Sequence, residues 1–347
     1  MKPPLSIALD AMGGDNGPQV VIAGAARALS NHAGLHYRLY GDEDVINRQL
    51  DRFEDLAAHS TVIHTSVTIA MDAKPSQALR AGRRDSSMWK AIEAVKLGKA
   101  DAVVSAGNTG ALMAMSKICL KMLPNIERPA IAGIWPTIKQ PAIVLDLGGN
   151  VGASATKLVD FALMGAAMSS AIFHIEKPSV GLLNIGVEEV KGVEEVKEAH
   201  AVLRASDLPV DYRGFIEGNS IGKGEVDVVV TEGFSGNIAL KTAEGTAEQM
   251  AFYLREAMNS SVLSKLGAFC ARSGFMALKD RMDTRRYNGG SFLGLKGIVI
   301  KSHGGTDDIG YASAIDYACE FAHAGLVDRI ATDVEHFHAS LNAQLVS

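Results

Sequence analysis

Short apolar runs rich in β-branched residues recur along the chain, and longer segments with helical spacing separate them. The runs cover residues 6–12, 35–41, 101–107, 142–149, 180–186, 225–233 and 297–305. Alternation of this kind predicts βα units around a mostly parallel sheet. Because most runs are almost continuously apolar, helices should cover the strands on both faces. The pattern therefore predicts an α/β fold, built as a three-layer α/β/α sandwich.

The segment from about residue 246 to 286 departs from this alternation. It shows no strand pattern, its apolar residues have helical spacing, and it is rich in arginine and lysine. Gly267 and Gly274 are predicted to break it into shorter helices. Elsewhere neither a linker nor a repeat of fixed period divides the chain. We expect a single domain over residues 1–347 with a basic amphipathic helical excursion at about 246–286.

Composition limits the function classes. Hydrophobic residues make up 47% of the 347 residues and charged residues 21%, which is typical of a soluble globular protein. The net charge of −5 gives no overall attraction for nucleic acid. Three widely spaced cysteines suggest neither a disulfide framework nor a zinc site. With no signal-peptide pattern and no apolar run long enough to span a membrane, the expected compartment is the cytoplasm.

Five of the predicted strands end in loops of small residues that then open a helix. Glycines in such loops let the backbone approach an anion, and the free N–H groups at the helix start bind it. Loops at the carboxyl ends of parallel strands are also where open α/β sheets bind ligands. The residues predicted to bind phosphate or substrate are Asp10, Gly13, Gly14, Ser105, Asn108, Thr109, Gly110, Asn150, Asn184 and Gly236.

Other chemistries fit the sequence poorly. No GxGxxG motif follows the first strand and no GxxxxGK[ST] motif occurs, which argues against NAD and ATP. GxSxG is absent and no cysteine lies in the loops, so a reaction without a covalent enzyme intermediate is favoured. Asp10 and Asp15 alone provide few carboxylates for a dedicated metal site. We therefore expect no cofactor and no essential metal.

The loops, taken in order, carry a resemblance to a known family. ALDAMGGDNGP, SAGNTGALMA, LDLGGNVG, VGLLNIGVEEVKG, DVVVTEGFSGNIALK and GLKGIVIKSHG resemble blocks of the phosphate acyltransferase (PlsX) family along nearly the whole chain. The resemblance implies reversible transfer of a fatty acyl group from acyl carrier protein to inorganic phosphate, giving acyl phosphate for phospholipid biosynthesis. It also implies a fold like those of phosphotransacetylases and the isocitrate and isopropylmalate dehydrogenases, with a homodimer built at the helical excursion.

Phosphorolysis of a thioester needs a phosphate pocket, donors for the carbonyl oxyanion and a way to release the thiolate. We expect phosphate at the Asn108, Thr109 and Gly110 loop with help from Lys191, and oxyanion donors at Gly236 and Asn237. His303 could protonate the leaving group or bind phosphate, although a loop histidine more often satisfies local hydrogen bonds. The catalytic candidates are therefore Lys191, Asn237 and His303.

Basic and apolar surfaces suggest partners. An acidic partner such as acyl carrier protein suits six arginines: Arg80, Arg83, Arg84, Arg281, Arg285 and Arg286. Within the excursion, membrane contact is expected at four apolar residues: Leu263, Leu266, Phe269 and Phe275. Packing on the core or on a dimer partner is the other interpretation of the excursion. Contact with the inner face of the cell membrane would place the product near a downstream glycerol-3-phosphate acyltransferase.

Two alternative functions stay open at this stage. A phosphotransacetylase acting on acyl-CoA would use the same loops beside a different thioester. A non-catalytic scaffold for carrier protein or membrane would keep the fold without turnover.

Overall fold

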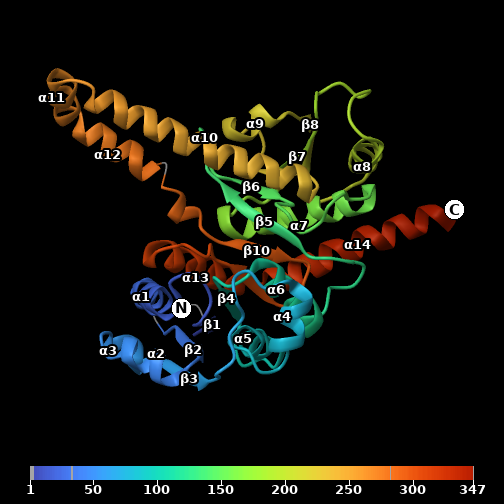
Figure 1. The fold of residues 1–347 in the computed structure, drawn as a ribbon. Coiled ribbons are helices and arrows are strands. Elements are labelled where there is room, and N and C mark those ends of the chain that lie inside the picture. The colour runs from blue at the N-terminus through green and yellow to red at the C-terminus, as the bar shows by residue number, and fades with distance from the viewer. Residues whose placement is uncertain (1–3, 33, 282, 347) are drawn as a thin grey trace.

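This computed structural model describes residues 4–32, 34–281 and 283–346 of the chain (Figure 1). Its strands are β1 (Ser6–Asp10), β2 (His36–Gly41), β3 (Ser60–His64), β4 (Ala102–Ser105), β5 (Ala130–Trp135), β6 (Ala142–Leu145), β7 (Ser179–Leu183), β8 (Asp211–Ile216), β9 (Val228–Val230), β10 (Gly290–Leu293) and β11 (Ile298–Lys301). Its helices are α1 (Gly17–Leu29), α2 (Glu43–Leu50), α3 (Glu54–Ala58), α4 (Pro75–Gly82), α5 (Ser87–Lys96), α6 (Thr109–Leu120), α7 (Ala155–Phe173), α8 (Glu194–Ala205), α9 (Gly218–Lys223), α10 (Gly233–Asn259), α11 (Val262–Cys270), α12 (Arg272–Arg281), α13 (Asp308–His323) and α14 (Leu326–Val346), with a short 3₁₀ turn at Thr284–Tyr287.

Within the described residues, the strands form one eleven-stranded sheet in the order β3-β2-β1-β4-β11-β10-β5-β6-β9-β7-β8. The five strands from β3 to β11 are mutually parallel, and so are the four from β6 to β8. β10 runs antiparallel to both of its neighbours, and β5 runs antiparallel to β6. The two parallel groups therefore run in opposite directions. The carboxyl ends of the two groups therefore lie at opposite edges of the sheet, where an edge means a row of strand ends and not an outermost strand.

Alternate side chains of the strands enter different cores, as the pleat of a strand requires. On β1, Ile7 and Leu9 belong to the core under α1 and α13, whereas Ala8 belongs to the core under α5 and α6. On β6, Ile143 and Leu145 face the α7 side and Val144 faces the other. Helices thus cover both faces of the sheet. The predicted three-layer α/β fold with a mostly parallel sheet is confirmed.

One helix in the described part of the chain, α7, is long and apolar enough to cross a membrane. It spans 19 residues, but 78% of its apolar window is buried inside the protein. It packs on β6 and β9 on one side and on α8 and α14 on the other. Burial of this kind identifies α7 as a core helix.

Helices α10, α11 and α12 form the predicted excursion, which projects away from the sheet (Figure 1). α10 begins earlier than expected, directly after β9, and runs for 27 residues without a break. The predicted breaks at Gly267 and Gly274 are wrong, because these glycines lie inside α11 and α12. The chain turns instead at residues 260–261, where Ser261 caps α11 through Ser264 N–H, and at Ala271. Two serines, and no glycine, therefore occupy the first turn of the hairpin: Ser260 follows the last residue of α10, and Ser261 caps the start of α11.

Candidate functional site

The glycine-rich loops form two groups because the sheet contains two parallel groups of opposite direction. The loops after β1, β4 and β11, residues 10–16, 105–110 and 301–306, share one edge and are here named the first loop cluster. Those after β6, β7 and β9, residues 146–152, 184–192 and 231–237, share the other edge and are named the second loop cluster. The candidate residues from the sequence are divided between them.

Asp10 and Ser105 organise the first loop cluster from the ends of adjacent strands. The Ser105 hydroxyl donates to Asp10 Oδ2 at 2.7 Å and accepts from the Gly107 N–H at 3.0 Å. Asp10 is 1% exposed, and burial raises the pKa of its carboxyl against the opposing effect of Ser105. Glycine is required at position 13, since a Cβ there would lie 2.7 Å from both Asp10 Oδ2 and Gly107 N. Two loops are thus held against each other by a buried polar contact.

Asn108 fixes the start of α6 beside the start of α4. Its Oδ1 accepts from Ala111 N–H, and its Nδ2 donates to the carbonyls of Met71 and Ala73. The side chain is therefore engaged in positioning the loop. The N–H groups of Thr109 and Gly110, in the first turn, have no carbonyl partner within the helix. They remain available to an anion, which the helix dipole also favours.

The loop after β11 completes the first loop cluster. Gly304 O accepts from Asp15 N–H at 2.9 Å, and Gly14 lies so close that a Cβ there would be 3.1 Å from the same oxygen. His303 is exposed, and its Nδ1 accepts from Gly305 N–H at 3.2 Å. The structure therefore brings His303 into the same cluster as Asp10, Asn108 and Thr109.

Asp146 has in the second loop cluster the position that Asp10 has in the first. Its buried Oδ1 accepts from the N–H groups of Ile131, Gly148 and Gly149, and its Oδ2 accepts from Asn150 Nδ2 at 2.8 Å. Asp146 was not among the residues predicted from the sequence. A signal was present, since Leu-Asp followed by paired glycines occurs both at 9–14 and at 145–149.

Glu232, also missed from the sequence, caps α10 at the end of β9. Its carboxylate accepts from Phe234, Ser235 and Gly152 N–H groups. Burial alone would raise the pKa of Glu232, but these hydrogen bonds hold it below its usual value. Asn237 donates from Nδ2 to Leu147 O at 3.1 Å.

Asn184 and Lys191 lie in the loop after β7. Asn184 Nδ2 donates to Lys191 O at 3.0 Å, and the exposed Lys191 ammonium pairs with Glu188 at 3.2 Å. Asn150, Gly236 and Asn237 share this edge of the sheet. Lys191 thus lies in the second loop cluster and Asn108 in the first. Within one chain, the lysine predicted to help bind phosphate is therefore at the opposite edge of the sheet from the predicted phosphate loop. The roles predicted for Lys191, Gly236 and Asn237 stay predictions.

The arginines predicted to dock a carrier protein have different surroundings. Arg80, Arg83 and Arg84 are exposed around the end of α4, with Arg83 stacked over Trp89 at 5.8 Å. Arg285 is paired with Asp283 and Asp307 at 2.7 and 2.8 Å, while Arg286 is exposed. Arg281 ends α12, and its side chain lies outside the described part of the structure. Arg80, Arg83, Arg84 and Arg286 thus remain the described docking candidates that lack an intramolecular ion pair of this kind.

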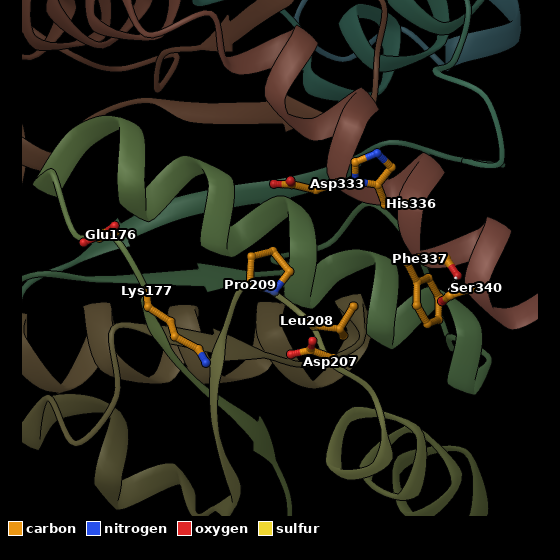
Figure 2. A pocket seen from close by; sticks show the side chains of 9 residues that line it. All are labelled: Glu176, Lys177, Asp207, Leu208, Pro209, Asp333, His336, Phe337 and Ser340. Atoms are coloured by element: carbon orange, nitrogen blue, oxygen red, sulfur yellow. Dashed lines mark hydrogen bonds between the residues drawn. The ribbon is translucent and has the colours of Figure 1, made fainter.

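A pocket of about 710 Å³ is lined by residues outside both loop clusters (Figure 2). It is formed by α14 residues Asp333, His336 and Phe337 and by the segments that precede β7 and β8. These segments are at the amino ends of the strands, opposite the glycine loops. Among the described residues, no cluster of three or more His, Cys, Asp or Glu could hold a metal ion.

Comparison with known proteins places the loops in a family. A model of the "Fatty acid synthesis protein" family matches residues 5–329. A phosphate acyltransferase of Beijerinckia indica is 58% identical over 347 residues, covering 100% of this chain and 90% of the relative. One of Afipia carboxidovorans is 59% identical over 331 residues, covering 95% and 94%. The chain belongs to the phosphate acyltransferase family.

Solved structures show the fold of this family member at lower identity. A phosphotransacetylase from Streptococcus pyogenes has a TM-score of 0.60 and 19% identity, covering 92% of this chain and 94% of that one. The EutD phosphotransacetylase from Staphylococcus aureus has a TM-score of 0.58 and 16% identity, covering 91% and 94%. The expected likeness to phosphotransacetylases is confirmed. Family membership makes the protein an acyltransferase.

Proposed function

We propose that the protein transfers a fatty acyl group from acyl carrier protein to inorganic phosphate, giving acyl phosphate for phospholipid synthesis. Family membership over nearly the whole chain is the observation that carries this proposal. The first loop cluster supports the phosphate part, since the first-turn N–H groups of α6, at Thr109 and Gly110, have no partner within the helix and can bind an anion. Phosphate is the nucleophile, so the enzyme needs no activated side chain.

The proposed reaction balances without a cofactor. An oxygen of hydrogen phosphate attacks the thioester carbonyl carbon, and a C–O bond forms as the carbonyl becomes an oxyanion. Collapse of the oxyanion breaks the C–S bond, and the proton lost by phosphate ends on the departing thiolate. Because the pKa of the thiol is about 8.5, the thiolate leaves without strong acid catalysis. His303, in the same cluster as the phosphate loop, is the candidate carrier of that proton.

Docking of the carrier is proposed beside the first loop cluster. Arg80 lies in the last turn of α4, and Arg83 and Arg84 follow the helix. Its first residue, Pro75, lies against Gly110 of the phosphate loop. An acidic carrier drawn to these arginines would present its thioester close to the loop. Association should then weaken as salt screens the charges.

The α10–α12 hairpin is proposed to form a homodimer and to touch the inner face of the cell membrane from the cytoplasm. Its only buried residues in α10 are Gly233 and Gly236, so most of the hairpin has no packing partner within the described chain. At its tip Leu263, Leu266 and Phe269 are 60% to 80% exposed. A membrane-bound enzyme would release its amphiphilic product where a glycerol-3-phosphate acyltransferase could consume it.

The decisive measurement is release of free thiol from palmitoyl carrier protein and from palmitoyl-CoA, each with and without phosphate. Hydroxylamine trapping then detects the acyl phosphate as hydroxamate. We expect phosphate-dependent release that favours the carrier. The phosphotransacetylase-like fold gives acyl-CoA transfer as the second candidate, and release from CoA alone would select it. Absence of phosphate-dependent release from both substrates would leave a scaffold role.

A further inference from the structure

Three side chains form a row at the first loop cluster, and only two of them were selected from the sequence. Lys301 pairs in register with Ser105, and the β1–β4 register places Asp10 beside Ser105. Residues in register on parallel neighbours point to the same face of a sheet. Asp10, Ser105 and Lys301 therefore end three adjacent strands on the face covered by α5 and α6.

The Lys301 ammonium lies directly beneath the phosphate loop. Nζ donates to Ala106 O at 3.2 Å, and Ala106 immediately precedes the 107–110 loop. It also donates to Ser302 O in its own loop. An ammonium has three donors, so one N–H remains after these two bonds. Lys301 is partly buried next to the first turn of α6, where an anion would bind. Its remaining N–H can therefore contact that anion.

Asp10 and Ser105 hold the loop above this ammonium. The bonds from Gly107 N–H to Ser105 Oγ and from Ser105 Oγ to Asp10 Oδ2 fix Gly107, the first residue of the loop. Among the described residues, Asp10 Oδ1 has no hydrogen-bond partner. The carboxylate is thus available to favour a positive charge nearby.

We propose that Lys301 supplies the ammonium that binds the attacking phosphate, and that Asp10 is a positioning residue acting through Ser105. This rests on the proposed phosphate-dependent function and replaces the exposed Lys191, which lies at the opposite edge, as the lysine of the phosphate pocket. Lysine binds phosphate as a compact point charge.

Its protonation gives the proposal a pH signature. Burial lowers the pKa of Lys301 to about 8, against the opposing effects of Asp15 and Asp10. The other ionisable groups around the row are His303 in the following loop and Tyr311 on α13, whose pKa burial raises well above its usual value. The ammonium is charged below about pH 8 and neutral above it. Phosphate affinity should therefore fall as the pH rises from 8 to 9.5.

The test compares wild type with Lys301→Met, Lys301→Arg and the control Lys99→Met, an exposed lysine at the amino end of β4. Loss of one charge-assisted contact should raise the KM for phosphate on the order of tenfold to a hundredfold in Lys301→Met. The KM for acyl carrier protein should stay at its wild-type value, as should both constants in Lys99→Met. Lys301→Arg should retain phosphate binding above pH 8, because a guanidinium keeps its charge.

Two results would overturn the proposal. One is a folded Lys301→Met variant, judged by circular dichroism, with a wild-type KM for phosphate. The other is a Lys301→Arg variant with the wild-type pH profile, which also decides the matter if Lys301→Met does not fold. Equilibrium dialysis with radiolabelled phosphate measures phosphate binding without turnover, and so tests the Lys301 site separately from the proposed function. If phosphate binding depends on Lys301 but the protein shows no turnover, the proposed function is contradicted and the phosphate site is supported.

Discussion

At the scale of single residues, the close contacts of glycine decide how the second loop cluster is built. Helix α10 begins against the end of β6, with Gly236 packed on the Asp146 carbonyl. A Cβ at Gly236 would collide with that oxygen, which belongs to backbone and cannot swing away. Gly245, about two and a half turns further along the same helix, has no atom within 4 Å of the position of an added Cβ. The two glycines therefore have different reasons to occur in one helix.

Gly236→Ala should lower the free energy of unfolding by about 1–3 kcal/mol or more, because the added methyl overpacks a backbone contact. Gly245→Ala, its matched control, should leave stability unchanged or raise it by up to about 1 kcal/mol, since alanine favours helix. Urea unfolding followed by circular dichroism measures both. Equal midpoints for the two variants would contradict the close approach of α10 to β6.

At the scale of elements, the sequence predicts buried strands well and half-buried strands poorly. All seven apolar runs contain a strand, but β3, β5, β8 and β10 were missed. β3 and β8 are the outermost strands of the sheet, and most of their residues are partly or fully exposed. β5 alternates buried and partly buried positions. β10 has the sequence Gly-Ser-Phe-Leu, so only two of its four residues are apolar. These strands lack the continuous apolar run that identified the others.

The candidate site was also only partly predicted from the sequence, for a different reason. The loops themselves were predicted, but their grouping depends on strand direction. β10 and β5 reverse the sheet between β11 and β6, and neither was recognised. Asn108 and Lys191 thus fall at opposite edges although their loops look alike in sequence. Lys301 gained its importance only from its register with Ser105, a contact between residues 196 positions apart.

The hairpin tip gives the prediction at this scale. The double variant Leu266→Glu with Phe269→Glu should abolish co-sedimentation with anionic phospholipid vesicles, because charge on the apolar face opposes insertion at the interface. Ile138→Glu, which alters a 75% exposed apolar residue between β5 and β6, should sediment with vesicles like wild type. Continued sedimentation of the double variant would assign the tip to packing alone.

At the scale of the whole molecule, the α10–α12 hairpin of the described chain exposes many large apolar side chains to solvent. Met250 and Leu254, one helical turn apart on α10, are 60% and 40% exposed. Tyr253, on the same side of the helix, is 53% exposed, and Phe252, on the other side, is 62% exposed. An apolar patch of this kind on a projecting helix suits a second copy of the same surface.

Sedimentation equilibrium should therefore give wild type twice the 36.7 kDa mass of the chain. Met250→Glu with Leu254→Glu should give the single-chain mass, because like charges would face each other across an isologous contact. Val190→Glu, at an 84% exposed residue in the loop after β7, serves as the control. A dimer that survives the double substitution would place the contact elsewhere.

The position of β11 also constrains how the protein can be made. β11 and α13, residues 298–323, complete the half of the sheet begun by β1 to β4, and α13 packs on α1. Nearly two hundred residues lie between β4 and β11, and the ribosome must add all of them before the partner strand of β4 exists. Until then β4 has an open edge and α1 an uncovered apolar face, both of which invite association with other chains. The first half of the sheet therefore stays incomplete while those residues are made, and chaperone protection would be most useful during that interval.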